Sequence, residues 1–243
     1  MILTEDIVKR NVERLVSKGE YDEADKISRE YARKVFESKV KRWSLHELSK
    51  FLLKSFCNLL CIHKLHELNT NRALSIGSTL SWIDVIKDGY RIFEVGTGLG
   101  TTCYAVICTS EVEEYITVEP SGEALAVALF KNPLNVCRKA LWNENVKILL
   151  GDPRFIISSM RRDVFDHVIC KGVLRFLRIP PSTRLLKRLV KMLKNNGTIA
   201  LLVEGNSELS NKIHHTLTLI QIRVQLVKTL NTSTSIFYGI KAL

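Results

Sequence analysis

Apolar residues recur at helical spacing through the first 68 residues of the chain, with polar and charged residues between them. This pattern predicts a helix that begins at a Thr4 cap and stops at Gly19, and a charge-rich, mostly solvated helix over residues 21–43. A third helix follows Ser44, which forms a capping box with Glu47, because hydroxyl and carboxylate each bind a backbone N–H at the helix start. We therefore expect a helical region over residues 1–75.

From Arg91 onward, short strand-like runs alternate with helical ones. Alternation of this kind indicates a parallel sheet with helices on both faces, so we expect an α/β domain over residues 76–243. The last two runs are separated only by the stretch NTSTS, which is too short for a crossover helix, and they should pair as an antiparallel hairpin. The expected strands are 91–96, 115–120, 146–152, 167–172, 198–205, 222–230 and 235–243.

The composition is that of an ordinary globular protein, with 46% hydrophobic and 25% charged residues among 243. No apolar run reaches the roughly 18 residues that a membrane helix needs, and acidic residues come too early in the chain for a secretion signal. We therefore expect a cytoplasmic protein without a membrane partner. The six cysteines are scattered through apolar segments of a long chain, which favours buried free thiols over disulfides.

The most informative motif is a strand that runs into three closely spaced glycines and then a helix, in RIFEVGTGLGTTCYAV, residues 91–106. Such a turn brings a ligand to a helix amino terminus, and glycine lets the ligand approach the backbone. The dinucleotide fingerprint G-x-G-x-x-G needs a glycine where Thr101 stands, and the lysine of a phosphate loop is absent. Both phosphate-binding interpretations are therefore weak.

The pattern E-x-G-x-G-x-G, from Glu94 to Gly100, resembles motif I of class I S-adenosylmethionine-dependent methyltransferases. The resemblance extends over about residues 88–243, through YITVEPS, ILLGDP, FDHVIC and LVKMLKNNGTIALLV, which match the following four strand regions in order. It implies a Rossmann-like, mostly parallel seven-stranded sheet and S-adenosyl-L-methionine as the cofactor. The implied cofactor-binding residues are Glu94, Gly96, Thr97, Gly98, Gly100, Glu119, Pro120, Asp152, Pro153 and Cys170.

The same resemblance implies a role for each of three acids. Glu94 would face the positively charged methionine end of the cofactor, Glu119 would accept hydrogen bonds from both ribose hydroxyls, and Asp152 would bind the adenine amino group. A plainer alternative stands beside two of these roles. Glu119 alone fits a solvated strand end, and Asp152 before Pro153 fits a turn former.

A narrower resemblance, to the predicted archaeal methyltransferases related to spermidine synthase, comes from VEPSGEALAVALFKNPLN, in which a strand-two acid precedes a helix that ends in Asn-Pro. The family pattern breaks at the end of the fourth strand, where this chain has ICKG. The Asp/Asn-Pro-Pro-aromatic motif of base amino methyltransferases and the aspartate of spermidine synthases are both missing. No catalytic residue is therefore assigned, and aminopropyl transfer and a noncatalytic binding protein stay open as alternatives.

Two residues in ICKG are candidates for chemistry. Cys170 occupies a position like that of a nucleophile, but its context favours a buried structural thiol. Lys171 would bind an acidic acceptor or the cofactor carboxylate, or simply hold its amine in water.

The net charge of +11 and the pI of about 9.4 favour an anionic partner such as RNA. Residues 171–194 contain eight basic and no acidic side chains. The first three would flank the substrate mouth, whereas the other five fit the solvated face of a helix whose leucines and valine face the sheet. The eight residues are Lys171, Arg175, Arg178, Arg184, Lys187, Arg188, Lys191 and Lys194.

The segment CNLLCIHKLH suggests zinc at first sight, but at 100° per residue its cysteines and histidines point to different sides of a helix. We therefore expect no metal at Cys57, Cys61, His63 and His66. The helical amino-terminal region would cover the cofactor, shape the acceptor site or form a homodimer contact.

Overall fold

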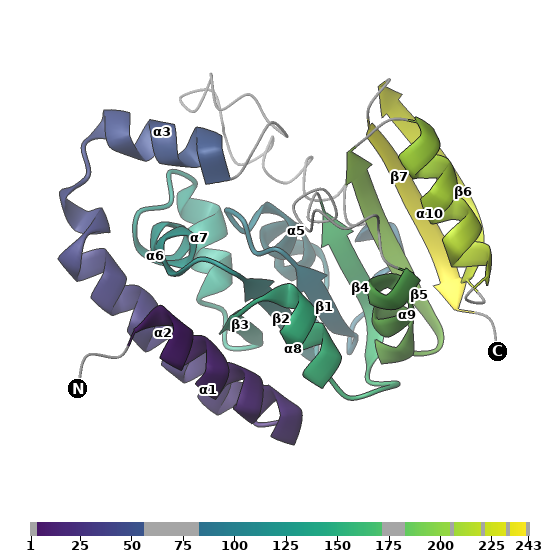
Figure 1. The fold of residues 1–243 in the computed structure, drawn as a ribbon, viewed down its shortest axis with the longest axis horizontal. Helices are drawn as coiled ribbons and strands as arrows, with labels where there is room; N and C mark the ends of the chain where they lie inside the picture. The colour runs from purple at the N-terminus through teal and green to yellow at the C-terminus, as the bar shows by residue number, and fades with distance from the viewer. Residues whose placement is uncertain are drawn as a thin grey trace.

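A computed structural model of the protein describes residues 4–55, 83–171, 183–204, 207–219, 222–231 and 234–241. Its helical amino-terminal part precedes a single seven-stranded sheet (Figure 1). The amino-terminal elements are α1 (Glu5–Lys18), α2 (Tyr21–Ser38), the 3₁₀ turn η1 (Val40–Arg42) and α3 (Leu45–Ser55). A second 3₁₀ turn, η3 (Ile83–Val85), leads into the sheet.

The sheet has the order β3-β2-β1-β4-β5-β7-β6. Strands β1 to β5 run parallel, and β7 pairs antiparallel with both β5 and β6. The predicted α/β fold, its parallel sheet and its carboxyl-terminal antiparallel hairpin are confirmed. The strands are β1 (Arg91–Val95), β2 (Glu114–Glu119), β3 (Val146–Leu150), β4 (Phe165–Lys171), β5 (Leu193–Glu204), β6 (Ile222–Asn231) and β7 (Thr234–Lys241).

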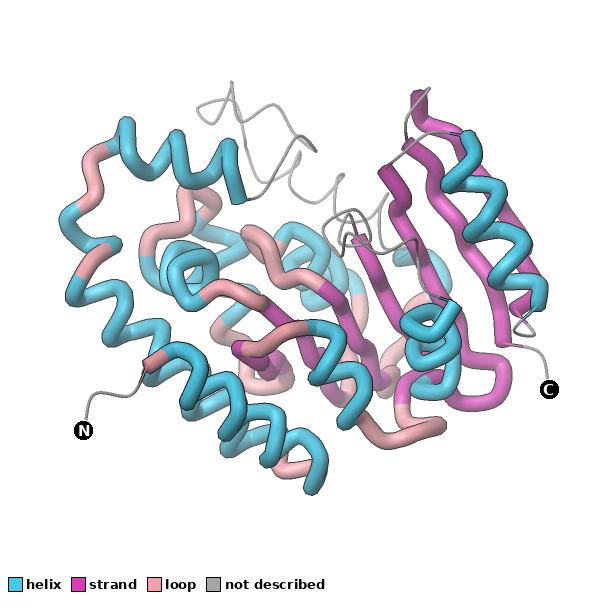
Figure 2. Tube along the Cα trace, viewed as in Figure 1, coloured by secondary structure: helices cyan, strands magenta, loops and turns pink. Residues whose placement is uncertain are grey.

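Helices cover both faces of this sheet, as Figure 2 shows. In the view of Figure 1, α8, α9 and α10 lie in front of the strands and α5 lies behind them. Because both faces are covered, β1 and β2 are buried along nearly their whole length rather than at alternate residues. The helices are α5 (Thr101–Thr109), α6 (Gly122–Phe130), α7 (Asn135–Leu141), α8 (Pro153–Ser159), α9 (Thr183–Met192) and α10 (Ser207–Leu219).

The amino-terminal helices begin and end close to where the sequence predicts. Gly19 ends α1 in the left-handed conformation, and the capping box before α3 forms, with Glu47 accepting from the Ser44 backbone N–H at 2.7 Å. One detail was wrong: Thr4 occupies the cap position of α1, but its exposed side chain makes no capping hydrogen bond, and its carbonyl accepts from Val8 instead. The boundary near residue 75 stays a prediction, because residues 56–82 lie outside the described ranges.

Helix α2 is more than the mostly solvated helix that its charges predict, because polar side chains on its inner face bind the edge strand β3. Leu150 N–H donates to Ser28 Oγ at 2.9 Å, Ile148 N–H donates to Asp25 Oδ1 at 2.7 Å, and Arg29 donates to the Val146 carbonyl at 2.9 Å. Alternate residues of β3 are thereby satisfied along its open edge. An edge strand left unpaired is a template for association with another chain, so α2 closes this edge.

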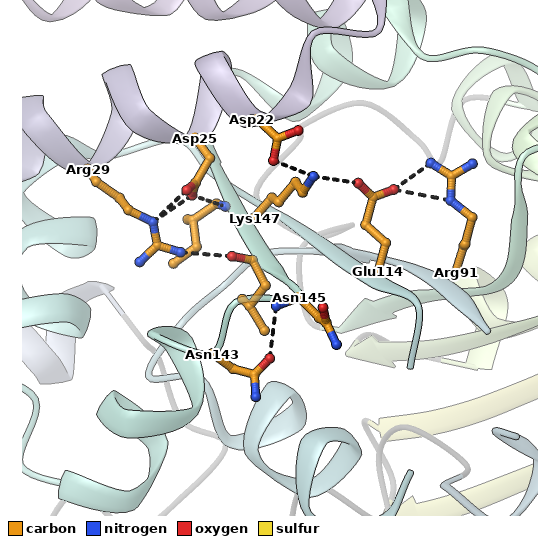
Figure 3. A network of polar contacts seen from close by, with 10 residues as sticks. Asp22, Asp25, Arg29, Arg91, Glu114, Asn143, Asn145 and Lys147 are labelled. Atoms are coloured by element: carbon orange, nitrogen blue, oxygen red, sulfur yellow. Dashed lines mark hydrogen bonds and ion pairs between the residues drawn. The ribbon is translucent and has the colours of Figure 1, made fainter. Parts of the chain in front are cut away.

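A charged network extends the contact from α2 into the sheet (Figure 3). Lys147 of β3 forms ion pairs with Asp22 of α2 at 2.5 Å and with Glu114 of β2 at 3.1 Å. Glu114 in turn accepts from Arg91 Nε of β1 at 3.2 Å. Charges of alternating sign from α2, β3, β2 and β1 therefore balance one another, and they hold α2 against the edge strand β3.

The described part of the chain contains no helix with the length and apolarity needed to cross a bilayer. Its four cysteines, Cys103, Cys108, Cys137 and Cys170, are free, as the sequence predicts, and three of them are buried, with Cys108 exposed.

We expect Ser28→Ala to lower the free energy of unfolding by about 1–3 kcal/mol, because it leaves the buried Leu150 N–H without a partner. Ser38→Ala is the matched control, since the Ser38 hydroxyl lies on the same helix but is exposed and binds only carbonyls within α2. Urea denaturation of both variants measures the difference. Equal losses in the two variants would contradict the edge-closing role of α2.

Candidate functional site

Three acids lie at one edge of the sheet, where β1, β2 and β3 end. Glu94 is the penultimate residue of β1, Glu119 is the last residue of β2, and Asp152 follows β3 by two residues. Since these strands are parallel and in register, their carboxyl ends meet at the same edge. The structure therefore brings together the three acids that the sequence singles out. In open α/β sheets, ligands bind outside this edge.

The glycine loop between β1 and α5 adopts a conformation that requires glycine. Gly96, Gly98 and Gly100 have φ angles of 95°, 54° and 75°, which L side chains rarely adopt. Backbone N–H groups of Gly96 and Thr97 donate to the Val118 carbonyl of β2 at 3.1 and 3.2 Å. The loop is thus held against the end of β2, beside Glu119.

Asn132, just after α6, holds the other side of this loop, and sequence reasoning did not assign it a role. Its amide nitrogen donates to the Leu99 carbonyl at 2.9 Å and to the Ala128 carbonyl at 3.2 Å, and its oxygen accepts from Leu134 N–H. The side chain is 7% exposed. The Asn-Pro pair at the helix end is the sequence signal for this residue, but it entered the sequence analysis only as part of a family resemblance.

The carboxyl group of Glu94 is fully buried in the centre of the sheet. Its Oε2 accepts hydrogen bonds from the Tyr115 hydroxyl at 2.7 Å and the Thr117 hydroxyl at 3.3 Å, both from β2. Burial, and then the charge of Glu94, raise the pKa of Tyr115 well above its ordinary value, so this hydroxyl stays a donor. Tyr115 and Thr117 were not assigned as partners of Glu94 in the sequence analysis. The available signal was their spacing, since residues two apart on a strand lie on the same face.

Glu119 is a buried carboxyl that changes its charge near neutral pH. Burial raises its pKa to about 7, against hydrogen bonds from the backbone N–H groups of Ser121 and Gly98 that favour the charged form. The Ser121 N–H lies 3.2 Å from Glu119 Oε1. The side chain therefore links the end of β2 to the glycine loop, and the alternative of a solvated strand end does not apply.

Asp152 is the N-cap of α8, with Pro153 in the first helical turn. Its Oδ1 accepts from the Arg154 backbone N–H at 2.8 Å, and its carboxylate pairs with the Arg154 guanidinium at 3.0 Å. Partial burial alone would raise the pKa of Asp152, but these hydrogen bonds lower it below its ordinary value. Asp152 thus stays charged and caps a helix, while its predicted contact with adenine stays a prediction. Pro153 is buried and Pro120 is exposed.

Cys170 lies near the end of β4, opposite Val95 of β1, and is fully buried. Burial, together with the charge of Glu94, raises the pKa of its thiol to about 12. A thiol of this kind is a poor nucleophile, which agrees with the structural interpretation of Cys170. Its place among the cofactor-binding residues stays a prediction. Lys171 ends β4, and its side chain is outside the description.

Two further sequence features contribute less to the site. Arg188 donates to the Ser158 carbonyl at 3.0 Å and Lys194 pairs with Asp166 at 2.9 Å, so part of the basic segment serves contacts within the fold. The apolar residues of α9 are buried, as expected. Cys57, Cys61, His63, His66, Arg175 and Arg178 lie outside the described residues, within which no cluster of three metal-ligating side chains occurs.

Comparison with protein families gives a match over residues 93–201 to the family model described as a methyltransferase domain. The match spans the glycine loop and all three acids. Together with the strand order and the antiparallel β7, it decides the fold. The chain has the Rossmann-like fold of class I methyltransferases. The resemblance predicted from the sequence is thereby confirmed.

Solved structures with this fold are similar to the chain at low identity. Spermidine synthase from Thermotoga maritima is 14% identical, with a TM-score of 0.56, over 70% of this chain and 60% of its own. A putative methyltransferase solved with the Haloferax volcanii Trm112 methyltransferase activator is 12% identical, with a TM-score of 0.56, over 81% of this chain and 98% of its own.

Haemonchus contortus phosphoethanolamine N-methyltransferase 2, solved in complex with S-adenosyl-L-methionine, is 13% identical with a TM-score of 0.54, over 72% of this chain and 53% of its own. The chain therefore spans little more than half of that methyltransferase and about three fifths of the spermidine synthase. Comparison with curated proteins gave no match.

We expect Gly100→Ala to destabilise the protein more than Gly89→Ala. Both glycines have nearly equal positive φ angles, 75° and 76°, so both variants incur about 1–2 kcal/mol of backbone strain. A Cβ at position 100 would also lie 2.9 Å from the Leu141 side chain, whereas one at position 89 meets nothing within 4 Å. Overpacking adds about 1–3 kcal/mol, which chemical denaturation measures. Equal losses would show that the glycine loop is not packed against α7.

Glu119 makes a second prediction about stability. Its pKa of about 7 in the folded protein exceeds the ordinary 4.5, so the stability that it contributes is complete below pH 4.5 and is lost as the pH rises to about 7. Between pH 5 and pH 8, the wild type should lose roughly 2–3 kcal/mol more than Glu119→Gln. Denaturation without cofactor at the two pH values tests this, and parallel pH profiles would refute it.

Proposed function

We propose that this protein is an S-adenosylmethionine-dependent methyltransferase whose cofactor binds at the carboxyl ends of β1, β2 and β3. The observation that carries the proposal is the Glu119 carboxyl, buried at the end of β2 and hydrogen-bonded to the glycine loop that follows β1. A carboxyl is costly to bury, and this one lies at the edge where the fold receives ligands.

The residues present fit this cofactor. A glycine loop with three positive φ angles allows close approach to the backbone, and a carboxyl with remaining acceptor capacity suits two ribose hydroxyls. Glu94 would serve the positively charged methionine end, Glu119 the ribose and Asp152 the adenine. When bound, the cofactor supplies an activated methyl group.

The chain itself has mainly to bind and orient. Because the methyl group is already activated, in-line positioning provides most of the acceleration, and a catalytic base is not required. No catalytic residue is assigned. The acceptor is open: RNA, another anionic substrate and a small molecule are the candidates for an acceptor screen. Apart from the acceptor, an activator protein is a candidate binding partner, because one structural neighbour was solved with a methyltransferase activator. Homodimerisation has no support in the structure.

Aminopropyl transfer is the rival enzymatic proposal, since a spermidine synthase is among the structural neighbours. The fourth strand of this chain ends at Lys171, in the region where the spermidine synthase pattern has an aspartate. A lysine there does not supply a carboxylate. A noncatalytic protein that retains the fold is the other rival.

Calorimetric titration with S-adenosylmethionine and with its decarboxylated form distinguishes these proposals. We expect the intact cofactor to bind more tightly. At pH 8, where Glu119 is charged, Glu119→Gln should weaken binding by about tenfold to a hundredfold, because hydrogen bonds to a charged acceptor are lost.

Glu113→Gln is the matched control, because the Glu113 carboxyl is 62% exposed and precedes β2 at its opposite end. Its affinity should equal that of the wild type. Preference for the decarboxylated form would favour aminopropyl transfer, and binding of neither form would favour the noncatalytic alternative.

A further inference from the structure

Helix α1 reaches the edge of the sheet at which the three acids lie. It packs against α8 and runs in the same direction, since Arg161, beyond the end of α8, donates to the Lys18 carbonyl at the end of α1 at 2.8 Å. At its other end, Glu5 Oε2 lies 2.7 Å from where a Cβ on Gly122 would be, at the first residue of α6. The first turns of α1 therefore lie between the starts of α6 and α8, which follow β2 and β3 (Figure 1).

Lys9 is one of two cations on these turns of α1, and the other, Arg10, donates to the Asp6 carbonyl. The Lys9 ammonium pairs with Glu5 at 2.7 Å, and its side chain is 23% exposed. The same positive charge acts on the carboxyls at the ends of two strands: it opposes the burial that raises the pKa of Glu119, and it contributes to the lowered pKa of Asp152. The geometry agrees: Glu5, the partner of Lys9, lies against Gly122, three residues after Glu119, so Lys9 lies near the carboxyl end of β2.

We propose that Lys9 is a positioning residue of the nucleoside end of this site: its ammonium favours the charged form of Glu119, which accepts hydrogen bonds from ribose hydroxyls. This inference rests on the proposed function. It also gives the amino-terminal helices a role in cofactor binding, which the sequence left as one alternative among three.

The charges around Lys9 show why Glu119 is the acid that depends on it. Asp152 already has the Arg154 guanidinium as its partner. Glu5 pairs with Lys9 directly, and both Lys9 and Arg10 oppose the burial that raises the pKa of Glu13. Glu119 has two backbone N–H groups and Lys9 in favour of its charge, opposed by burial and by Glu94 of β1. Removal of Lys9 should therefore shift Glu119 toward its protonated form.

The test is calorimetric titration of wild type, Lys9→Met and Lys9→Arg with S-adenosylhomocysteine from pH 5.5 to pH 9. The wild-type affinity should rise with pH and level off above about 7, the pKa of Glu119. In Lys9→Met the midpoint should move up by about half to one pH unit, which weakens binding about two- to fivefold at pH 7 and leaves it unchanged at pH 9. Lys9→Arg should restore the wild-type profile.

Lys18→Met is the matched control, because Lys18 is an exposed lysine at the opposite end of the same helix. Its profile should match that of the wild type. If Lys9→Met binds with an unchanged midpoint, or more weakly by the same factor at every pH, the inference is overturned while the proposed function stands. If the wild type does not bind, the proposed function fails and the inference fails with it.

Discussion

The open edge of β3 is the constraint on which the arrangement of the amino-terminal helices depends. Backbone groups at the edge of a sheet need hydrogen-bond partners, and here Asp25, Ser28 and Arg29 of α2 supply them. Helix α2 packs against α1 in turn. Helix α1 also packs against α8, and its first turns lie beside the carboxyl ends of β2 and β3. The contacts that close the edge strand β3 therefore also hold α1 beside the candidate site.

The site concentrates polar groups that are costly to bury. Glu94 is held by two hydroxyls of β2, and Glu119 by backbone N–H groups, so each carboxyl has specific partners in an otherwise apolar sheet. A fold selected for stability alone would place apolar residues at both positions. Their position next to three glycines with positive φ angles supports the proposed cofactor, which carries positive charge at one end and hydroxyl groups at the other.

The strands, their mostly parallel arrangement and the carboxyl-terminal hairpin followed from the sequence because strand periodicity, glycine spacing and connection length are local patterns. Glu94, Glu119 and Asp152 came together as predicted, since parallel strands bring their ends to one edge. Contacts between distant segments were not predictable in this way. The hydrogen bonds from Asn132 to the Leu99 carbonyl and from Tyr115 to Glu94 join residues that no local pattern relates. The charges of α2 read as solvent-facing because the edge that binds them is more than a hundred residues away.

A crystal structure of the protein with S-adenosylhomocysteine tests the central claim most directly. The account predicts the ligand at the carboxyl ends of β1 to β3, with its ribose hydroxyls on Glu119 and its chain against the loop from Gly96 to Gly100. A ligand bound elsewhere, or one at this edge without contact to Glu119, would contradict it.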